Sequence, residues 1–438
     1  MSRTPSSSPF RRRRSSAIAA AQGNALVENT ENGEVDQDGA SILFDWAADG
    51  NNVGSRAIRN RGIWRMRDGA IIGFMSSTGR GLWIPHFITS GTFSLGKGCH
   101  LALQRFRNSG EAVFEAPSQI GHAAAWGSED ELANVGTLSV TGSDSTRPVR
   151  FGWTPSQRMR EAPPGQRRRN LRRLVHDHAG RRLPPRGQPG DGRECRRLRL
   201  QRPIRLPRSR WPPATNGSGH PFNNREAKVS NQGEFILGGR LSVQGNHGGF
   251  TGIDNFGDLR LTDGAVLERL PNSAGEGSFY KADATSSRIE NRPGATARVS
   301  GAFAYRNSTG NAEGRRLLFR NAGRLEVEGG AAMTDVDLVL ANAGEGKESV
   351  LRATLGTDAD AALLQLAGTT EGTGVLSIDD EAATVLEIVV PEGMAPHGAF
   401  RVVEAAAIRG TFASVRVAGS DAACDIRVAD AALDVVFP

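Results

Sequence analysis

The chain has 438 residues, of which 54 are glycine and only 6% are aromatic, and its formal net charge is +7. A globular enzyme of this length usually buries more large side chains, so the composition favours one elongated repeat domain over two or three compact domains. No apolar run approaches the roughly 18 to 20 residues that a membrane helix needs, which excludes an integral helical membrane protein.

Residues 1–54 predict a basic and polar N-terminal tail. The run Arg11–Arg14 is followed by small residues, as in an export signal, but the apolar core of about 7 to 15 residues is missing. An acidic and polar stretch extends from Glu28 to Asp38. Because such a composition can bury little apolar surface, we expect this tail to be disordered.

A recurring unit begins in the next block, residues 55–146. It consists of Asn, one further residue and Gly, followed by apolar residues at alternating positions, as in Asn108–Phe114. Asn and Gly accept positive φ at the least cost, and a period of two is typical of strands, so the unit predicts a tight corner and then a strand. Asn108 and Asn134 are 26 residues apart, whereas Asn60 and Asn108 are 48 apart. This period indicates a solenoid, and the block predicts four coils.

Residues 147–222 interrupt the pattern. Between Arg147 and Pro213 there are 20 arginines, no lysine and four acids, a net charge of +16 that leaves −9 on the rest of the chain. Proline removes ladder donors and like charges repel, so this segment cannot continue a sheet. Three interpretations of this irregular insert remain open: a disordered linker, an element within 147–213 that binds nucleic acid or lipid, and a product of frame slippage in GC-rich DNA. The acidic remainder is not expected to bind nucleic acid.

The units resume over residues 223–438, most clearly in the stretch 231–243. There, two glycines separate two short runs in which the apolar residues alternate, and these are Phe235, Leu237, Leu241 and Val243. Further corners begin at Asn255, Asn291 and Asn321. Coils of about 20 to 30 residues, stacked about 4.8 Å apart, predict roughly eight coils and a rod about 40 Å long for this block.

Recurrence of one corner before very short strands favours a parallel β-helix over the alternative, an antiparallel β-sandwich. Stacked corners would let each Asn join a ladder of side-chain hydrogen bonds. The Asn-x-Gly-x-Leu-x-Val units, over about 60–150 and 223–438, resemble those of autotransporter passengers and filamentous-haemagglutinin-like proteins, which are right-handed parallel β-helices. The closing runs Gly398–Ala405, Gly410–Val415 and Ala432–Phe437 are similar to the last coils of such passengers. The resemblance implies a surface-exposed or secreted rod.

Three groups of acids are candidates for carboxylate chemistry: Asp335 and Asp337, Asp358 and Asp360, and Asp379-Asp380-Glu381. Pectin-degrading β-helix enzymes place carboxylates on one sheet face for acid/base catalysis or calcium binding. Asp335 and Asp337, two apart on a predicted strand, would point the same way. The alternative is that all three groups are solvated carboxylates of turns and strand faces.

Other motifs carry less chemistry. Residues 341–348 resemble a phosphate loop but lack its first Gly and the Ser or Thr after Lys347, so we predict a turn. Residues 248–254 do not fit the calcium-binding nonapeptide, whose sites form between successive repeats. His176 and His178 lie in the Arg-rich segment without a carboxylate or thiol cluster nearby.

The three cysteines are far apart in the sequence, at Cys99, Cys195 and Cys424, and no Cys-x-x-Cys pair exists. Neither a zinc site nor a disulfide framework is therefore predicted. We assign no catalytic, cofactor-binding or metal-binding residues and no cofactor.

The sequence predicts a non-catalytic surface or secreted β-solenoid, an adhesin-like or passenger-like structural or binding module. Its expected partner is a host or cell-surface carbohydrate or protein. Two alternatives come from other classes: a carbohydrate-active β-helix enzyme, either polysaccharide lyase or hydrolase, and a basic protein that binds nucleic acid through 147–213. The enzyme needs several carboxylates that converge in a groove, whereas a binding rod does not.

Overall fold

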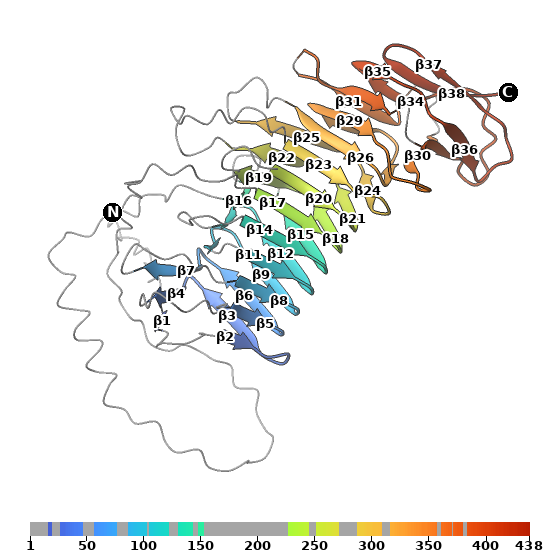
Figure 1. Cartoon of the computed structure of the whole chain (residues 1–438). Coiled ribbons are helices and arrows are strands. Elements are labelled where there is room, and N and C mark those ends of the chain that lie inside the picture. Colours follow the sequence, from blue (N-terminus) through green and yellow to red (C-terminus); the bar gives the residue numbers. More distant parts are fainter. Residues whose placement is uncertain are drawn as a thin grey trace, which may run out of the picture.

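All regular structure in the described part of the chain is β-strand. The computed structural model describes residues 16–19, 27–46, 57–76, 86–102, 105–121, 130–142, 148–152, 227–244, 251–270, 287–308, 316–356, 361–369, 371–379 and 383–438. Figure 1 shows the strands stacked into one column, with the blue N-terminal strands at one end and the red C-terminal strands at the other. The chain passes through one strand of each of three sheets and then returns to the first sheet, so three strands make one coil.

Sheet 1 has 14 strands and is the only one of the three with antiparallel pairs in the described ranges, at its C-terminal end. Its strands are β1 Ser16–Ala19, β4 Ser41–Trp46, β7 Ile71–Ser76, β10 His100–Leu101, β13 Ser118–Ile120, β16 Val149–Gly152, β19 Arg240–Gln244, β22 Ala265–Arg269, β25 Ala302–Asn307, β28 Ala331–Thr334, β31 Leu364–Ala367, β34 Gly398–Ala405, β38 Ala432–Phe437 and β37 Asp425–Val428.

Sheet 2 has 12 strands, and each is parallel to its neighbours. Its strands are β2 Val27–Asn29, β5 Ala57–Asn60, β8 His86–Thr89, β11 Arg105–Asn108, β14 Asp130–Asn134, β17 Ala227–Asn231, β20 Thr251–Asn255, β23 Ser287–Asn291, β26 Leu317–Asn321, β29 Val336–Leu340, β32 Val375–Ile378 and β35 Ala407–Arg409.

Sheet 3 also has 12 parallel strands, and it follows sheet 2 after a short corner. Its strands are β3 Glu34–Asp38, β6 Ile63–Arg67, β9 Thr92–Leu95, β12 Glu111–Glu115, β15 Thr137–Thr141, β18 Glu234–Leu237, β21 Asp258–Leu261, β24 Thr296–Val299, β27 Arg324–Val327, β30 Ser349–Thr354, β33 Thr384–Val389 and β36 Ser414–Ala418.

Parallel pairing between successive coils makes the protein a β-solenoid. A sandwich of two antiparallel layers, the alternative prediction, is wrong, because antiparallel pairing in the described ranges is confined to β34, β38 and β37. With strands about 4.8 Å apart, 12 strands give a column roughly 50 Å long. Four sheet 2 strands, β5 to β14, lie in the block predicted to hold four coils, and seven lie in the block predicted to hold about eight.

Alternation along each strand builds the core. In the stretch 231–243 the predicted core residues Phe235, Leu237, Leu241 and Val243 are each no more than 1% exposed. The inward side chains of successive coils form one hydrophobic cluster along the column. In the first block aromatic rings stack within it: Phe87 lies 4.6 Å from Phe93 and 5.7 Å from Phe106, centroid to centroid. Each coil therefore shields the apolar face of its neighbours.

The Asn of each repeat lies inside the column, at the end of its sheet 2 strand, where it joins a ladder. Asn231 is fully buried, and its Nδ2 donates to Asn255 Oδ1 at 2.7 Å, while its Oδ1 accepts from Asn134 Nδ2 at 2.8 Å. The same amide also donates to the carbonyls of Gly233 and Asp258. Buried side chains joined in this way are Asn29, Asn60, Asn108, Asn134, Asn231, Asn255, Asn291 and Asn321, with Thr89 as the acceptor for Asn60.

The glycine that lies two residues after six of the eight ladder asparagines is needed for close stacking, which differs from the predicted reason. Gly233 does not have positive φ. Instead, a Cβ at this position would lie 2.2 Å from the carbonyl oxygen of Gly136 in the preceding coil. A Cβ at Gly257 would lie 2.3 Å from the Gly233 oxygen. Successive corners therefore touch through their backbones, and only glycine fits.

The column begins earlier than predicted. Strands β1 to β4 lie within 1–54, the range predicted to be a disordered tail, so that prediction is wrong for the described residues of this range. The first coil is hard to see in the sequence because a polar residue takes an inward position. Gln37 of β3 is 4% exposed and donates to the carbonyls of Ala40 and Ile71. The buried amide of Gln37 is tolerated in the core because its polar atoms form hydrogen bonds.

The column continues across the Arg-rich segment without a break. Strand β16, Val149–Gly152, lies inside the range predicted to be irregular and pairs with both β13 and β19. The rest of that range, from 153, lies outside the described residues. Asn134 and Asn231, although 97 residues apart, are direct ladder neighbours. The 74 residues between β16 and β17 are therefore added to a coil that is otherwise complete.

Long connections gather at the corner from sheet 1 to sheet 2. This corner takes three residues between β10 and β11, one between β28 and β29, and 74 between β16 and β17. The corner from sheet 2 to sheet 3, which we call the asparagine corner, takes two residues in β5–β6, β14–β15 and β17–β18. The longest connection thus lies at the corner from sheet 1 to sheet 2, where no ladder fixes the chain, whereas the asparagine corner lengthens to eight residues between β29 and β30.

We expect replacement of Asn231 by alanine to destabilise the column by about 3 kcal/mol, because the change removes four buried hydrogen bonds and leaves partners in two coils unsatisfied. Urea denaturation followed by circular dichroism measures the shift in midpoint. Gln232→Ala, at the exposed neighbouring position, is the control and should change the free energy of unfolding by less than about 0.5 kcal/mol. Equal effects of the two substitutions would contradict a stabilising ladder.

We also expect replacement of 153–226 by Gly-Ser-Gly to leave the column intact. Phe151 is in register with Leu101, and Lys228 is in register with Arg105. Only three residues connect Leu101 to Arg105, so a short connection can span the same corner. The urea midpoint of the shortened chain should therefore match that of the full chain. Loss of the cooperative transition would show that the segment contributes to the fold.

Candidate functional site: the outer face of sheet 3 and the asparagine corner

Asp335 and Asp337 each accept hydrogen bonds from the following coil. Asp335 forms the one-residue connection before β29, with φ of 58°, so the strand alternation used to predict its direction does not apply. It accepts from Thr369 N at 2.7 Å and from Thr369 Oγ1 at 2.6 Å. Asp337 is 6% exposed, accepts from Val375 N and pairs with Arg316 at 2.8 Å. Both carboxylates hold one coil against the next.

The remaining predicted groups contribute little to a described site. Asp358 and Asp360, Asp380 and Glu381, and His176 and His178 lie outside the described residues, as do positions 248–250 of the glycine-rich motif. Asp379 follows β32 and is half-buried. Within the described ranges, no group of three or more His, Cys, Asp or Glu side chains is placed to hold a metal ion.

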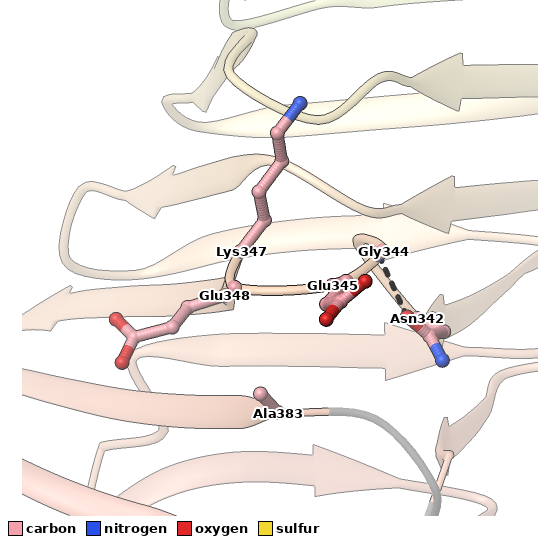
Figure 2. Close-up of a pocket in the computed structure, with 7 residues that line it drawn as sticks. Asn342, Gly344, Glu345, Lys347, Glu348 and Ala383 are labelled. Atoms are coloured by element: carbon pink, nitrogen blue, oxygen red, sulfur yellow. Dashed lines mark hydrogen bonds between the residues drawn. The ribbon is translucent and has the colours of Figure 1, made fainter.

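The loop 341–348 is a turn, as predicted, and its polar groups do not converge. The side chain of Asn342 accepts from Gly344 N at 2.7 Å, and Lys347 N donates to the Gly344 carbonyl at 3.1 Å. Figure 2 shows a shallow depression here in which Glu345, Lys347 and Glu348 point in different directions. A phosphate site needs several amides and a cation aimed at one point, and this loop lacks that arrangement.

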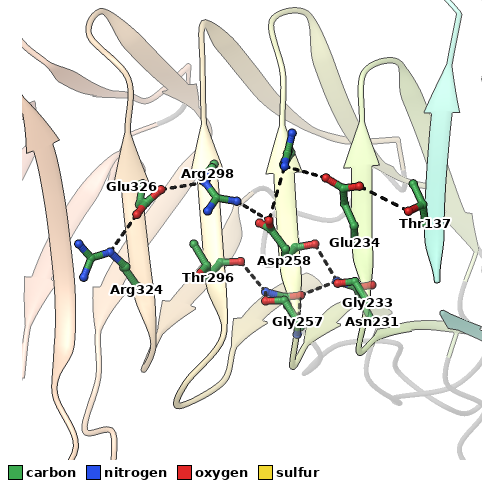
Figure 3. Close-up of polar contacts among 12 residues, drawn as sticks. Thr137, Asn231, Gly233, Glu234, Gly257, Asp258, Thr296, Arg298, Arg324 and Glu326 are labelled. Carbon is green, nitrogen blue, oxygen red and sulfur yellow. Dashed lines mark hydrogen bonds and ion pairs between the residues drawn. The ribbon is translucent and has the colours of Figure 1, made fainter. Parts of the chain in front are cut away.

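The outer face of sheet 3 carries a polar network that extends over several coils. In-register pairing places one outward residue of each coil beside the next, which gives the row Arg260, Arg298, Glu326, Arg352, Glu387 and Arg416. Figure 3 shows the central part of this network, from Thr137 to Arg324. No sequence motif indicates this network, because most of its partners lie on different strands and are brought together by the register of the sheet.

Charges of opposite sign alternate through the network. Glu326 accepts from Arg298 Nε at 2.8 Å and from Arg324 Nε at 2.9 Å, and Arg324 also reaches Glu387 at 2.8 Å. Arg298 pairs on its other side with Asp258, and Arg260 pairs with Glu234 at 2.7 Å. Each arginine therefore links two or more strands, and the face neutralises itself along the column.

The pKa of Glu326 reflects this competition. Partial burial alone would raise the pKa, but hydrogen bonds from Arg324 and Arg298 outweigh that effect and lower it below the ordinary 4.5. Burial likewise opposes the charge of Arg298, yet the hydrogen bonds with Asp258 and Glu326 leave its pKa raised. The hydrogen bonds between neighbouring coils thus favour the charged forms of both Glu326 and Arg298.

The asparagine corner carries a second feature, which no sequence pattern indicates. Among the described residues, the exposed large hydrophobic side chains are Val135, Phe256 and Val428, and the first two occupy equivalent corner positions two coils apart, at 59% and 50% exposure. Arg292, at the corner of the next coil, lies over the Phe256 ring at 5.6 Å from its centroid. We call the corner residues Ser109, Val135, Gln232, Phe256 and Arg292, from five successive coils, the corner ridge.

Comparison of the chain with protein-family models, with curated proteins and with solved structures gives no match. In the described part of the chain, no helix is long and apolar enough to cross a membrane.

We expect Glu326→Gln to lower the free energy of unfolding by about 1 kcal/mol at pH 7 and low salt, because it removes the charge between three arginines. A glutamate whose folded pKa is lowered contributes stability above its ordinary pKa of 4.5, and that contribution is lost as the pH falls through the lowered folded value. The difference between parent and variant should therefore vanish at low pH.

Urea midpoints measured between pH 7 and pH 3 test this dependence. Glu345→Gln is the matched control, since Glu345 is exposed on the neighbouring loop and points away from its charged neighbours (Figure 2). A difference for Glu326→Gln that persists unchanged at low pH would contradict the assigned role of its charge.

Proposed function

We propose that the chain is a non-catalytic β-solenoid of surface or secreted type, a structural or binding rod similar to right-handed passenger-like β-helices. The observation that carries this proposal is that charged side chains on the outer face of sheet 3 form ion pairs with side chains of other coils. Such pairs tie neighbouring coils together, and stacked coils form the extended surfaces with which repeat proteins bind their partners. A carbohydrate or protein on a host or cell surface is the proposed partner class.

The main rival is a carbohydrate-active β-helix enzyme. That activity needs carboxylates that converge around a bound sugar with about 5 to 9.5 Å between them and room for the substrate. Asp335 and Asp337, the strongest candidates, instead accept hydrogen bonds from the next coil. Their engagement supports a structural role for both. The nucleic-acid alternative through 147–213 rests on residues outside the described ranges, apart from Val149–Gly152 of β16.

Protease shaving of intact producing cells tests the proposed location. We expect an added protease to release peptides from 227–438 without lysis, or the chain to be found in the medium. Recovery of those peptides only after the cells are lysed would contradict a surface or secreted rod. A cytoplasmic protein of the same cells, assayed in the same digest, controls for leakage.

A polysaccharide panel tests the absence of catalysis. We expect no release of reducing or unsaturated ends by the full chain. Release that is abolished by Asp337→Asn in a variant with unchanged circular dichroism would favour the enzyme. Salt-sensitive binding of nucleic acid that disappears when Gly-Ser-Gly replaces 153–226 would favour the third function.

A further inference from the structure

The corner ridge presents side chains in fixed positions. Each ridge residue donates its backbone N–H to a carbonyl of the preceding coil: Val135 to Asn108 at 2.8 Å, and Phe256 to Asn231 at 2.7 Å. The Cα positions along the ridge are therefore set by the ladder beneath them. An exposed side chain on such a support loses little backbone entropy when it is buried against another surface.

Phe256 is also held from the side. Arg292 packs over its ring, and the guanidinium is in turn fixed by Asp254, whose Oδ1 lies 2.6 Å from Arg292 Nε. The side chain of Asp254 is only 5% exposed, so this ion pair is anchored in the face of sheet 2. Aromatic residues and arginine in ordered positions are the side chains that most often dominate protein–protein binding energy.

The order of residues along the ridge is self-complementary. Read from either end with Gln232 at the centre, Val135 lies opposite Phe256, and Ser109 lies opposite Arg292. If a second copy lay antiparallel on the first, apolar side chains would meet apolar ones and no like charges would face each other. Farther out, Arg61 of the second coil, which pairs with Glu28, would face the 341–348 loop of the tenth, where Glu345, Lys347 and Glu348 are exposed.

We propose that the corner ridge is a self-association surface, and that two copies of the chain pack antiparallel about a two-fold axis through Gln232. An isologous contact of this kind requires that each surface be its own complement, which the ridge satisfies. Five coils span only about 20 Å, so the contact between the two copies is small. We therefore expect a weak dimer, which is only partly populated when the chain is at about 100 µM or below. This inference does not depend on the proposed function.

Cysteine cross-linking tests the position of the axis. Gln232 is exposed and lies on the proposed axis, so Gln232→Cys should form a disulfide with its own copy under mild oxidation. The background carries Cys195→Ser and Cys424→Ser, so that only the buried Cys99 remains. Ser109→Cys is the matched control, because Ser109 is also exposed but lies two coils from the axis. We expect at least tenfold more cross-linked dimer for Gln232→Cys than for Ser109→Cys.

Sedimentation of the full chain at concentrations up to about 200 µM supplies the independent measurement. Phe256→Ser should weaken self-association at least fivefold, whereas Thr141→Ser, an exposed position on sheet 3, should leave it unchanged. Phe256→Ser with an unaltered urea midpoint excludes a folding defect. A strictly monomeric chain, equal cross-linking at 109 and 232, or a dimer that Phe256→Ser does not weaken would each overturn the proposal.

Discussion

The structure depends on one constraint, the in-register parallel pairing of each coil with the next. Residues at the same place in successive coils lie one strand spacing apart, about 4.8 Å, so every row of side chains must be compatible with itself. Asn134 and Asn231 satisfy this rule across 97 residues of sequence, at 2.8 Å. The same register sets Glu326 beside Arg298 and Arg352 on the outside. One geometric rule thus produces the core, the ladder and the charged face.

The architecture could be predicted from the sequence because the repeat is local. An Asn-x-Gly corner followed by alternating apolar residues identifies sheet 2, the corner and sheet 3, and the predicted core around Phe235 and Leu237 is buried as expected. What failed depends on contacts between coils. The need for glycine at 233 comes from the backbone of the coil below, and the first coil was hidden by the inward Gln37. Neither contact is visible in a local pattern.

The candidate site was much less predictable, for the same reason. Arg324 and Glu387 are 63 residues apart yet 2.8 Å from each other, and coils of unequal length conceal that alignment. Strand alternation does not predict the direction of the Asp335 side chain, because Asp335, with φ of 58°, lies before its strand and not on it. Periodicity within a coil shows which face a residue occupies; only the register shows which charges meet on that face.

The two corners that flank sheet 2 differ in how much their length can vary. A connection from sheet 1 to sheet 2 can vary from one to 74 residues because the strands on either side are held by their own neighbours. The asparagine corner has no such freedom where a buried amide and a glycine carbonyl bind it to both adjacent coils. A surface that must keep a fixed spacing over many coils is therefore best placed at the asparagine corner or on sheet 3. Insertions and new sequences can be accommodated at the corner from sheet 1 to sheet 2 without disturbing that surface.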